Sequence, residues 1–431
     1  MTIATIGHGY VGLVSAAVFA DLGNTVWCVG RNKKKIDELK KGIPPFFEPG
    51  LEEMVKRNVK AGRLKFTLDY HEAVPGADAV FICVGTPPKE NGEADLSSVF
   101  KAAQGIGQNL DGYTVVVCKS TVPIGTNRVV AKILEKEKPQ KATFDIASCP
   151  EFLKEGTAIS DTVNPDRIVI GAESEEAKGL LTELHRPIDG KIVLTTIEAA
   201  EMIKYASNAL LATKISFANA VAFLCERAGA DVEEVLEGVG LDKRIGKAFL
   251  APGVGYGGSC FPKDVKALIA TARQYDYDFK LLSDVDEINE QAARFFVEKT
   301  VKACGGSVKG KKLGVWGLSF KPSTDDMREA PSVKIIESLQ KKGAEISAYD
   351  PQAVENAKQI LKNIKYARNP YKAIENAEAL LIVTEWNEFR QIDLKKVKKL
   401  MKKSVILDGR NIYDPQKIKN LGFSYFGVGR S

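Results

Sequence analysis

The chain has 431 residues, 44% of them hydrophobic and 27% charged, and its formal net charge is +6. This length and apolar content predict two or three domains with full-sized cores. The positive charge comes largely from short lysine clusters that are typical of solvated helix surfaces, so we expect no nucleic-acid partner. Because no run of about 18 apolar residues stands out and no leader precedes the first strand, we expect no membrane segment and a cytoplasmic location.

The seven cysteines show no regular spacing, and only three histidines occur in the whole chain. An odd, scattered set of thiols is typical of a reducing compartment and argues against a disulfide framework or a zinc ribbon. So few histidines also argue against a catalytic zinc site, and we predict no metal. Any catalytic proton acceptor should therefore be Lys, Asp, Glu or a water that they polarise.

The chain opens with a predicted strand, residues 2–6, a glycine-rich turn, a helix over 13–22 and a second strand over 25–29. This order is the context that the dinucleotide fingerprint G-x-G-x-x-G requires. In that pattern the first glycine permits the tight turn, the second lets a pyrophosphate approach the helix N-terminus, and the third permits close helix–strand packing. The predicted cofactor-binding turn consists of Gly7, Gly9, Tyr10, Val11 and Gly12.

The end of the second predicted strand departs from the NAD pattern. An Asp or Glu there normally binds the adenosine ribose. This chain instead has Gly30-Arg31, followed by lysines that include Lys35. Without a carboxylate nothing repels a 2′-phosphate, and Arg31 is able to pair with it. We predict that NADP is accepted and preferred; the alternative is that the lysines only begin a solvated helix and that NAD binds.

Two further predicted strands, residues 79–84 and 114–119, are followed by Thr86 and Thr121. Ligands bind beyond the carboxyl ends of parallel strands, so both threonines are expected to lie at the cofactor. Either one is alternatively a turn residue before proline.

A long helix is predicted from about residue 198 to 228, where no proline or glycine occurs. Thr195 and Glu198 form a plausible capping box. Large apolar residues recur every seven positions, which predicts a helix buried between two domains and against a second subunit. Lys204 and Asn208 share one face of this helix. A lysine there is costly unless it is paired, or else it reaches solvent.

The loop over residues 253–264 carries four glycines in six positions and ends with Cys260, Lys263 and Asp264. A thiol becomes nucleophilic when a nearby cation lowers its pKa, and a carboxylate is able to activate water against the captured group. The alternative is that Cys260 is a small buried hydrophobic residue.

The last third begins a second strand-then-glycine pattern over residues 311–322 but lacks the full fingerprint, so its ligand should differ from a dinucleotide. We therefore predict an α/β fold with two doubly wound, Rossmann-like domains joined by a long central helix. The predicted domains are residues 1–196 for the cofactor, 197–302 for dimerisation and the active-site loop, and 303–431 for the second ligand, which is a nucleotide sugar by the family resemblance that residues 255–264 carry.

Residues 255–264, Gly-Tyr-Gly-Gly-Ser-Cys-Phe-Pro-Lys-Asp, resemble the active-site loop of the UDP-glucose 6-dehydrogenases, within the nucleotide-sugar dehydrogenase family. Segments 149–156 and 164–171 are similar as well, and the resemblance covers residues 2 to 428. It implies oxidation of UDP-glucose to UDP-glucuronate by two hydride transfers, through a thiohemiacetal and a thioester on Cys260. It also implies a homodimer in which Arg244 reaches the nucleotide sugar of the neighbouring subunit.

The resemblance assigns roles to individual residues. Lys204 and Asn208 stabilise the oxyanion at C6, and Asp264 with water supplies proton transfer and hydrolysis. Thr121 and Glu155 complete the catalytic set, and Glu155 positions water. Thr86, Thr121, Glu155, Lys263 and Arg328 join the cofactor site. The substrate site consists of Glu151, Phe152, Leu153, Lys154, Glu155, Lys204, Asn208, Arg244, Phe249, Leu250, Gly253, Gly257 and Lys321.

Three alternatives stay open at this point. Relatives that act on GDP-mannose or UDP-N-acetylhexosamines share the architecture. A two-electron β-hydroxyacid dehydrogenase shares the cofactor domain but needs neither Cys260 nor the last domain. A catalytically silent sensor of nucleotide sugars would not need Lys204, Asn208, Cys260 and Asp264 together.

Overall fold

The computed structural model describes residues 1–430, and Ser431 lies outside the described residues. The chain forms two compact units. The first consists of Met1–Ser207 with Ala270–Asp276, and the second of Asn208–Ile269 with the residues from Tyr277 on. The predicted boundaries at residues 196 and 302 stay a prediction.

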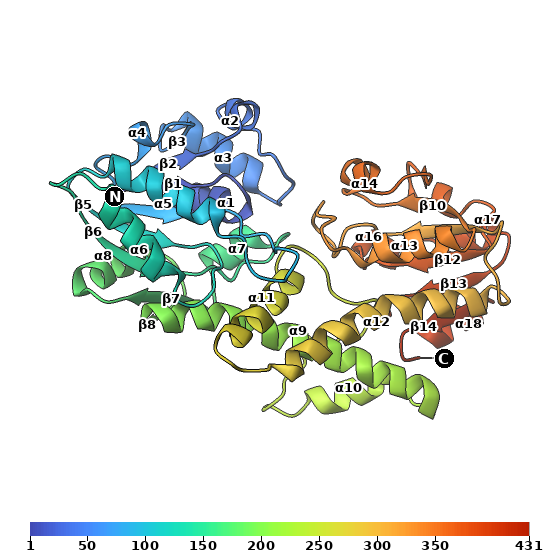
Figure 1. The fold of residues 1–431 in the computed structure, drawn as a ribbon. Coiled ribbons are helices and arrows are strands. Elements are labelled where there is room, and N and C mark those ends of the chain that lie inside the picture. Colours follow the sequence, from blue (N-terminus) through green and yellow to red (C-terminus); the bar gives the residue numbers. More distant parts are fainter. Residues whose placement is uncertain (431) are drawn as a thin grey trace. The chain divides into compact units, whose positions relative to one another are not determined.

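The first unit is built on an eight-stranded sheet in the order β3-β2-β1-β4-β5-β6-β7-β8, coloured blue to green in Figure 1. Its first six strands have the order of a dinucleotide-binding doubly wound fold. All neighbours are parallel except β6 and β7, which pair antiparallel. The strands are β1 (Thr2–Ile6), β2 (Thr25–Val29), β3 (Leu64–Thr67), β4 (Ala79–Ile82), β5 (Tyr113–Cys118), β6 (Thr143–Ser148), β7 (Arg167–Ala172) and β8 (Lys191–Thr195).

Helices cover both faces of this sheet (Figure 1). Along β5, Val115 and Val117 belong to one buried cluster and Val116 to the other. Burial on both faces is the reason that these strands read as continuous apolar runs in the sequence. The helices are α1 (Tyr10–Asp21), α2 (Lys33–Leu39), α3 (Leu51–Lys60), α4 (Tyr70–Ala73), α5 (Ser97–Asn109), α6 (Thr126–Glu137), α7 (Ala158–Val163) and α8 (Glu175–His185).

The long predicted helix is present as α9 (Ile197–Ala228), with 32 residues. Its predicted capping box is wrong, because Thr195 ends β8 and the Thr196 hydroxyl instead accepts a hydrogen bond from Ala199 N at 3.3 Å. The Glu198 carboxylate pairs with Arg128 Nε at 2.7 Å, which holds it on the surface of α6. Thr195 therefore belongs to β8 and Glu198 pairs with α6, so the two residues do not cap α9 together.

By length and composition alone, α9 is apolar enough to cross a bilayer, contrary to the expectation that no such stretch exists. The core helix of a water-soluble protein meets the same criterion. Glu201 and Lys204 on α9 are buried in the first unit, where they contact Asn127 and Glu151. These polar contacts indicate a helix that packs inside protein.

The second unit contains a six-stranded, fully parallel sheet in the order β11-β10-β9-β12-β13-β14, which repeats the doubly wound order. The predicted fold class is thus confirmed. Its strands are β9 (Lys312–Trp316), β10 (Glu345–Tyr349), β11 (Lys365–Tyr366), β12 (Ala379–Ile382), β13 (Val405–Asp408) and β14 (Ser424–Gly427). The helices after α9 are α10 (Val232–Gly240), α11 (Phe261–Gln274), α12 (Lys280–Ala303), α13 (Pro331–Lys341), α14 (Val354–Ile360), α15 (Pro370–Ile374), α16 (Asn387–Arg390), α17 (Leu394–Leu400) and α18 (Pro415–Asn420).

Candidate active site

The glycine-rich turn of the first unit has the shape that a dinucleotide needs. A side chain at Gly12 would place its first carbon 2.0 Å from the Gly7 carbonyl oxygen, so only glycine permits this packing of α1 on β1. Gly9 precedes the first turn of α1, and the space beside its Cα is open within 4 Å. A helix N-terminus that is open at a glycine accepts a pyrophosphate through its free backbone amides. The turn therefore fits the cofactor that its pattern predicts.

Tyr10 ties this turn to the segment before α3. Its ring stacks on Phe46 at 4.0 Å, and its hydroxyl donates a hydrogen bond to the Phe47 carbonyl at 2.6 Å. The next residue of that segment, Glu48, accepts hydrogen bonds from the amides of Gly156 and Ala158 at 2.6 and 2.7 Å. The cofactor turn and the segment with Glu155 are therefore fixed to one another through residues 46–48.

The end of β2 carries cations where a carboxylate would bind a ribose. Arg31 and Lys35 are both exposed, and Gly30 is buried. The Asn32 side chain caps α2 by accepting a hydrogen bond from Lys35 N at 3.1 Å. This cap sets the direction in which α2 and its lysines leave the sheet.

Thr86 and Thr121 meet, as the rule for strand ends predicts. The Thr86 hydroxyl donates to the Thr121 carbonyl at 2.9 Å, and the hydroxyl of neighbouring Ser120 donates to the Val84 carbonyl at 2.7 Å. The turns after β4 and β5 are thus joined at the carboxyl edge of the sheet, where a doubly wound fold binds its cofactor.

Sequence reasoning missed Glu201, which connects α9 to the turn after β5. Its carboxylate accepts hydrogen bonds from Gly125 N at 2.6 Å and from Asn127 N and Nδ2 at 2.9 and 2.7 Å. Burial raises the pKa of Glu201. In the sequence Glu201 is one glutamate among several on a long helix, and no pattern distinguishes it.

Lys204 forms a buried ion pair. Its Nζ lies 3.1 Å from Glu151 Oε1, and the two side chains are only 4% and 7% exposed. The other carboxylate oxygen of Glu151 accepts a hydrogen bond from Leu153 N at 2.8 Å. The lysine therefore does not reach solvent, and residues 151–153 are held against α9.

Phe152 packs between two cations. The Arg167 guanidinium lies 3.7 Å from the centre of its ring, and Lys204 Nζ lies 5.3 Å from it. Arg167 also donates a hydrogen bond to the Ser207 hydroxyl at 3.3 Å, and burial lowers the pKa of Arg167. Arg167 thus fixes the ring against α9 one turn beyond Lys204, a role that the sequence did not reveal.

The remaining residues of this segment lie close by. The amide of Lys154 donates to Asp161 at 2.9 Å, and its ammonium lies 3.4 Å from the same carboxylate. Glu155 is buried, with 7% of its surface exposed. A carboxylate at such a depth is suited to hold a water molecule and is not a solvated surface group.

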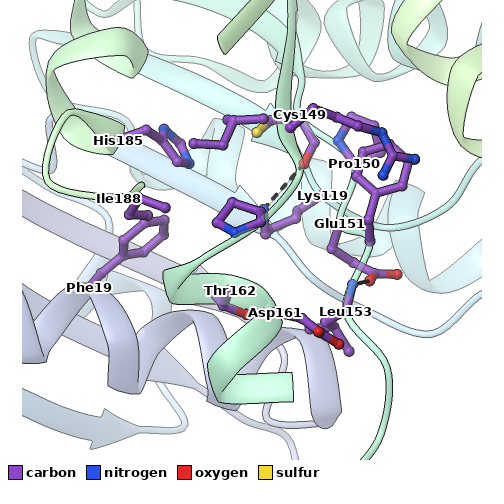
Figure 2. A pocket seen from close by; sticks show the side chains of 14 residues that line it. Phe19, Lys119, Cys149, Pro150, Glu151, Leu153, Asp161, Thr162, His185 and Ile188 are labelled. Carbon is purple, nitrogen blue, oxygen red and sulfur yellow. Dashed lines mark hydrogen bonds between the residues drawn. The ribbon is translucent and has the colours of Figure 1, made fainter. Parts of the chain in front are cut away.

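A cavity of about 50 Å³ lies behind residues 149–153 (Figure 2). The buried Lys119 donates a hydrogen bond to the Cys149 carbonyl at 3.5 Å, and the His185 ring closes the far side. Burial, and then the charge of Lys119, lower the pKa of His185 to about 4. His185 is therefore neutral in the folded protein at neutral pH.

This buried histidine makes stability depend on pH. The unfolded chain protonates His185 below about pH 6.5, whereas the folded protein does so only near pH 4, so its contribution to stability is present above pH 6.5 and is lost as pH falls through 4. We expect the free energy of unfolding to fall by about 3 kcal/mol through this group. Urea titrations at intervals from pH 7 to 4 should show this decrease in the free energy of unfolding in native protein and in His71→Gln. A His185→Gln variant whose free energy of unfolding decreased equally over this pH range would contradict the role of His185.

In the second unit Asn208, Asp264 and Lys263 form a connected group. Asn208 Nδ2 donates to Asp264 Oδ2 at 2.6 Å, and the Lys263 ammonium pairs with the other oxygen of that carboxylate. Asp264 is 1% exposed. The amide of Asp264 donates to the Cys260 carbonyl at 2.9 Å, so Lys263 and Asp264 lie on the first turn of α11 beside the cysteine, and Asn208 reaches them from α9.

Cys260 differs from the buried cysteines. It is half-buried, its Sγ lies 3.6 Å from the Ser259 hydroxyl, and it directly precedes α11. A helix N-terminus favours the negative charge of a thiolate. Burial, by contrast, raises the pKa of Cys28 and of Cys83 to about 12 and so keeps those thiols protonated. Cys260 is thus not the small core residue of the alternative interpretation.

The glycines of the loop before Cys260 are needed for close packing. A first carbon at Gly257 would lie 2.2 Å from the Glu329 carbonyl oxygen. Gly258 has φ +84° and donates its amide to the Arg328 carbonyl at 2.9 Å. On the other side, Asn289 of α12 hydrogen-bonds both the amide and the carbonyl of Tyr256. The loop is thereby fixed from two sides.

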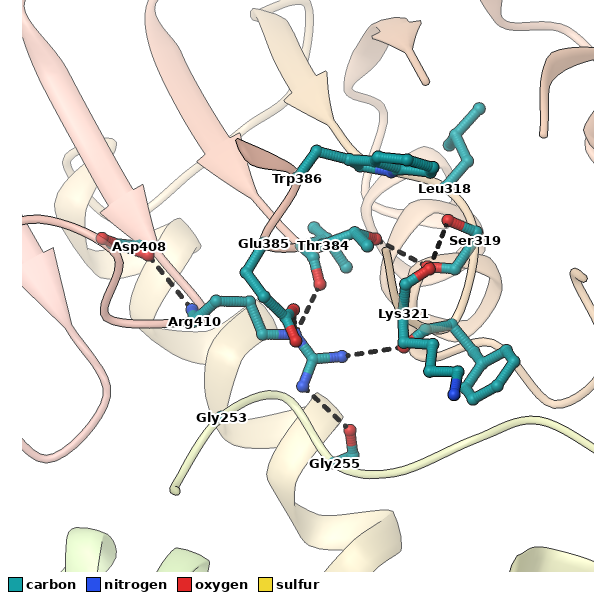
Figure 3. Close-up of polar contacts among 12 residues, drawn as sticks. Gly253, Gly255, Leu318, Ser319, Lys321, Thr384, Glu385, Trp386, Asp408 and Arg410 are labelled. Carbon is teal, nitrogen blue, oxygen red and sulfur yellow. Dashed lines mark hydrogen bonds and ion pairs between the residues drawn. The ribbon is translucent and has the colours of Figure 1, made fainter. Parts of the chain in front are cut away.

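Arg410 joins three elements of the second unit (Figure 3). It donates hydrogen bonds to the carbonyls of Val383, Phe320 and Gly255 at 2.8, 3.3 and 3.5 Å. Its Nε also lies 3.2 Å from the Glu385 carboxylate. Lys321 follows Phe320, and its ammonium lies 5.4 Å from that ring.

In the second sheet, the carboxylate at the position that binds ribose in a dinucleotide fold is hydrogen-bonded within its own domain. Asp350 directly follows β10, the position where a dinucleotide fold carries the ribose carboxylate. Asp350 is buried and accepts hydrogen bonds from the amides of Leu318 and Ser319 and from Trp386 Nε1, at 2.7, 3.1 and 3.1 Å. This agrees with the prediction that the ligand of this domain is not a dinucleotide.

Several predicted residues lie outside these groups. Arg244 and Arg328 each form a local ion pair at 2.6 Å, with Asp242 and Asp326. Phe249 has the unusual φ of 63° and its ring lies 6.2 Å from that of Phe261. Leu250 and Gly253 are buried, and Val11 is half-buried against the core of the first unit.

Comparison with known proteins covers the whole chain. The family models described as UDP-glucose/GDP-mannose dehydrogenase family, NAD binding domain, central domain and UDP binding domain match residues 1–189, 198–291 and 314–415. The UDP-glucose 6-dehydrogenase TuaD of Bacillus subtilis is 48% identical over 99% of this chain and 93% of its own length. A solved UDP-glucose dehydrogenase from Pyrobaculum islandicum is 39% identical, with a TM-score of 0.93 over 100% of this chain and 98% of its own. A UDP-D-ManNAc dehydrogenase from Pyrococcus horikoshii is 30% identical, with a TM-score of 0.88 over 100% and 99%.

Proposed function

This chain belongs to the UDP-glucose/GDP-mannose dehydrogenase family, and we propose that it oxidises UDP-glucose to UDP-glucuronate in two hydride transfers. The observation that carries the proposal is the pairing of Asp264 with Asn208 of α9 and with Lys263, which lies with Asp264 on the first turn of α11 beside the half-buried Cys260. A two-electron β-hydroxyacid dehydrogenase needs no thiol at that place. A silent sensor needs neither the thiol nor the carboxylate.

A nicotinamide cofactor, which the turn of Gly7, Gly9 and Gly12 would hold, would supply the hydride acceptor for the first oxidation, and a second oxidised cofactor would replace it for the second oxidation. In the first step the C6 alcohol also loses a proton to solvent through Asp264 and becomes an aldehyde. The Cys260 thiolate adds to the aldehyde carbon, and Lys204 and Asn208, one turn apart on α9, stabilise the oxyanion. Loss of a second hydride gives a thioester. Water positioned by Glu155 and activated by Asp264 then releases the carboxylate and the thiolate.

Further residues are proposed to complete the two binding sites. Thr86, Thr121, Lys263 and Arg328 contact the cofactor. The UDP-sugar is held by residues 151–155, by the Phe249–Gly253 segment, by Gly257 and by Lys321. Support comes from the hydrogen bond between Thr86 and Thr121 and from the hydrogen bond that Arg410 donates to the carbonyl of Phe320, the residue before Lys321.

A panel of nucleotide sugars tests the substrate. We expect UDP-glucose to yield two reduced cofactors per uronate and to have the highest kcat/KM. UDP-N-acetylmannosamine and GDP-mannose should be turned over at least about 100-fold less efficiently, because each changes a group that the site must fit. One reduced cofactor per UDP-glucose would contradict the four-electron reaction, and a higher kcat/KM for UDP-N-acetylmannosamine would reassign the substrate.

NADP is proposed as the preferred cofactor. Arg31 and Lys35 are exposed at the end of β2, where no carboxylate stands to repel a 2′-phosphate. Replacing Arg31 with Asp exchanges a charge-assisted contact for a repulsive one, so we expect the ratio of kcat/KM for NADP to that for NAD to fall by about 100-fold or more. Initial rates at saturating UDP-glucose measure this ratio. Lys34→Asp is the matched control, and an equal ratio in native and Arg31→Asp protein would contradict the proposal.

The chain is also proposed to form a homodimer through α9. Leu210, Phe217 and Leu224 recur every seven residues along this helix and are 64%, 52% and 66% exposed in the single chain. An exposed apolar stripe of this kind favours association with a second copy. Arg244, whose side chain is 88% exposed, is proposed to reach the partner's nucleotide sugar. Sedimentation equilibrium should give twice the chain mass of 46.9 kDa.

A cytoplasmic location is proposed on chemical grounds. Among residues 1–430, which include all seven cysteines, no disulfide is formed, and the mechanism requires Cys260 as a thiol. A reducing compartment keeps thiols in that state. Fractionation of cells that express the native chain, followed by detection of the protein, tests the location.

A further inference from the structure

His8 occupies the variable position between Gly7 and Gly9 of the cofactor turn, and the mechanism gives it no role. Its imidazole lies over the end of β2, because a first carbon at Gly30 would stand 2.7 Å from His8 Nδ1. The same carbon would stand 2.6 Å from Cδ1 of Ile36 in α2. Gly30 therefore lacks a side chain because the imidazole and α2 fill that space.

Two cations act on this imidazole from two other segments. Partial burial, then the charge of Lys35 on the first turn of α2, then that of Arg31 after β2, lower the pKa of His8. Both charged groups that act on His8 are thus positive. Three side chains from three segments converge where a dinucleotide fold holds the adenosine ribose, and an anion there would relieve their repulsion.

We propose that His8, Arg31 and Lys35 together bind the 2′-phosphate of NADP, and that His8 becomes protonated when this phosphate binds. This inference rests on the proposed preference for NADP. It adds a third contact and makes that preference depend on pH. A 2′-hydroxyl carries no charge and would not protonate the imidazole, so His8 discriminates between the two cofactors.

The sign of the pH effect follows from linkage. In the free protein partial burial, and then the neighbouring cations, hold the pKa of His8 below its ordinary value and so favour the neutral imidazole. A dianionic phosphate within hydrogen-bonding distance raises that pKa. The contribution of His8 to affinity is therefore present at pH values below the pKa of the complex and is lost as pH rises through it.

Adenosine 2′,5′-bisphosphate and adenosine 5′-monophosphate (AMP) are suitable probes, because they differ only by the 2′-phosphate. Calorimetric titration of the full chain at pH values from 6.0 to 8.5 compares native protein with His8→Thr. We expect the variant to bind the bisphosphate about 5- to 10-fold more weakly than native protein at pH 6.0, and less than about 2-fold more weakly at pH 8.5. The titration of the phosphate itself is common to both proteins and cancels in this ratio.

Affinity for AMP serves as the check on folding and should change less than about 2-fold in His8→Thr. His71→Thr, at an exposed histidine outside the site, should match native protein with both probes. A second measurement needs no variant for the effect itself, since imidazole proton resonances report the pKa directly. Only three histidines occur, so spectra of His8→Thr and His71→Thr assign the resonances of these two residues.

We expect saturation with the bisphosphate to raise the pKa of His8, and saturation with AMP to leave it near that of the free protein. Suppose that the bisphosphate binds better than AMP, but that it does not raise the His8 pKa and its affinity does not depend on His8. The phosphate is then held by Arg31 and Lys35 alone and this inference fails, while the preference for NADP stands. If the bisphosphate binds native protein no better than AMP, the preference and the inference fail together. Oxidation of UDP-glucose is unaffected by either result.

Discussion

Replacement of Cys260 with serine is expected to lower the steady-state rate of uronate formation at least about 1000-fold. Serine is nearly isosteric, but its hydroxyl is far less acidic than a thiol and adds poorly to an aldehyde without a base. The thioester that water must hydrolyse is then not formed. The helix N-terminus and the Asp264 group beside residue 260 stay in place, so the loss reports the sulfur atom alone.

Coupled measurement of reduced cofactor and uronate checks this expectation, and mass spectrometry of native protein quenched with UDP-glucose should detect the sugar on the peptide that contains Cys260. Cys304→Ser is the matched control, because Cys304 is the other cysteine that is not fully buried. It directly follows α12, and no catalytic role is proposed for it. Native rates in Cys260→Ser, with two reduced cofactors per substrate, would show that the sulfur is not the nucleophile.

Replacement of Lys204 with methionine is expected to lower kcat about 100- to 1000-fold, the usual cost of removing one donor to a developing oxyanion. It should also destabilise the fold by about 3–5 kcal/mol, because the Glu151 carboxylate is left buried without its partner. Both effects arise from one ammonium, and a second variant separates them.

The double variant Lys204→Met with Glu151→Gln removes the buried charge and should regain most of the lost stability but little of the activity. Urea titration and kcat measure the two quantities. Lys178→Met is the control for a surface pair: its partner Glu175 has a side chain that is 88% exposed, so stability should change by less than about 1 kcal/mol. Retained kcat in Lys204→Met would contradict the role at the oxyanion.

The cofactor turn could be predicted because its information is local. Gly7, Gly9 and Gly12 lie within one strand–turn–helix: Gly7 has φ +125°, Gly12 packs against the Gly7 carbonyl, and Gly9 leaves the helix N-terminus open. The convergence of Thr86 and Thr121 was predictable for a related reason, since the carboxyl ends of parallel strands share one edge of the sheet. Local periodicity also predicted α9, although its cap was assigned to the wrong threonine.

The contacts around Lys204 could not be predicted in the same way. Glu151, Arg167 and Glu201 each act on residues that are distant in the chain, and none carries a pattern of its own. Arg167 was noticed only as part of a motif. Its stacking on Phe152 depends on how β7 and the segment after β6 meet at α9.

The sequence by itself determined the class of fold, the dinucleotide turn, the absence of a ribose carboxylate after β2 and the thiol–lysine–carboxylate order at residues 260–264. Only the tertiary structure decided that Lys204 is paired with Glu151 and that Asp350 accepts hydrogen bonds from the turn after β9. It also decided that His8 lies over Gly30 beside two cations. The physical reason is that backbone pattern and turn chemistry act between near neighbours in the chain. Burial, pairing and the electrostatic field at a side chain are set by whatever residues the fold brings around it, whatever their distance in sequence.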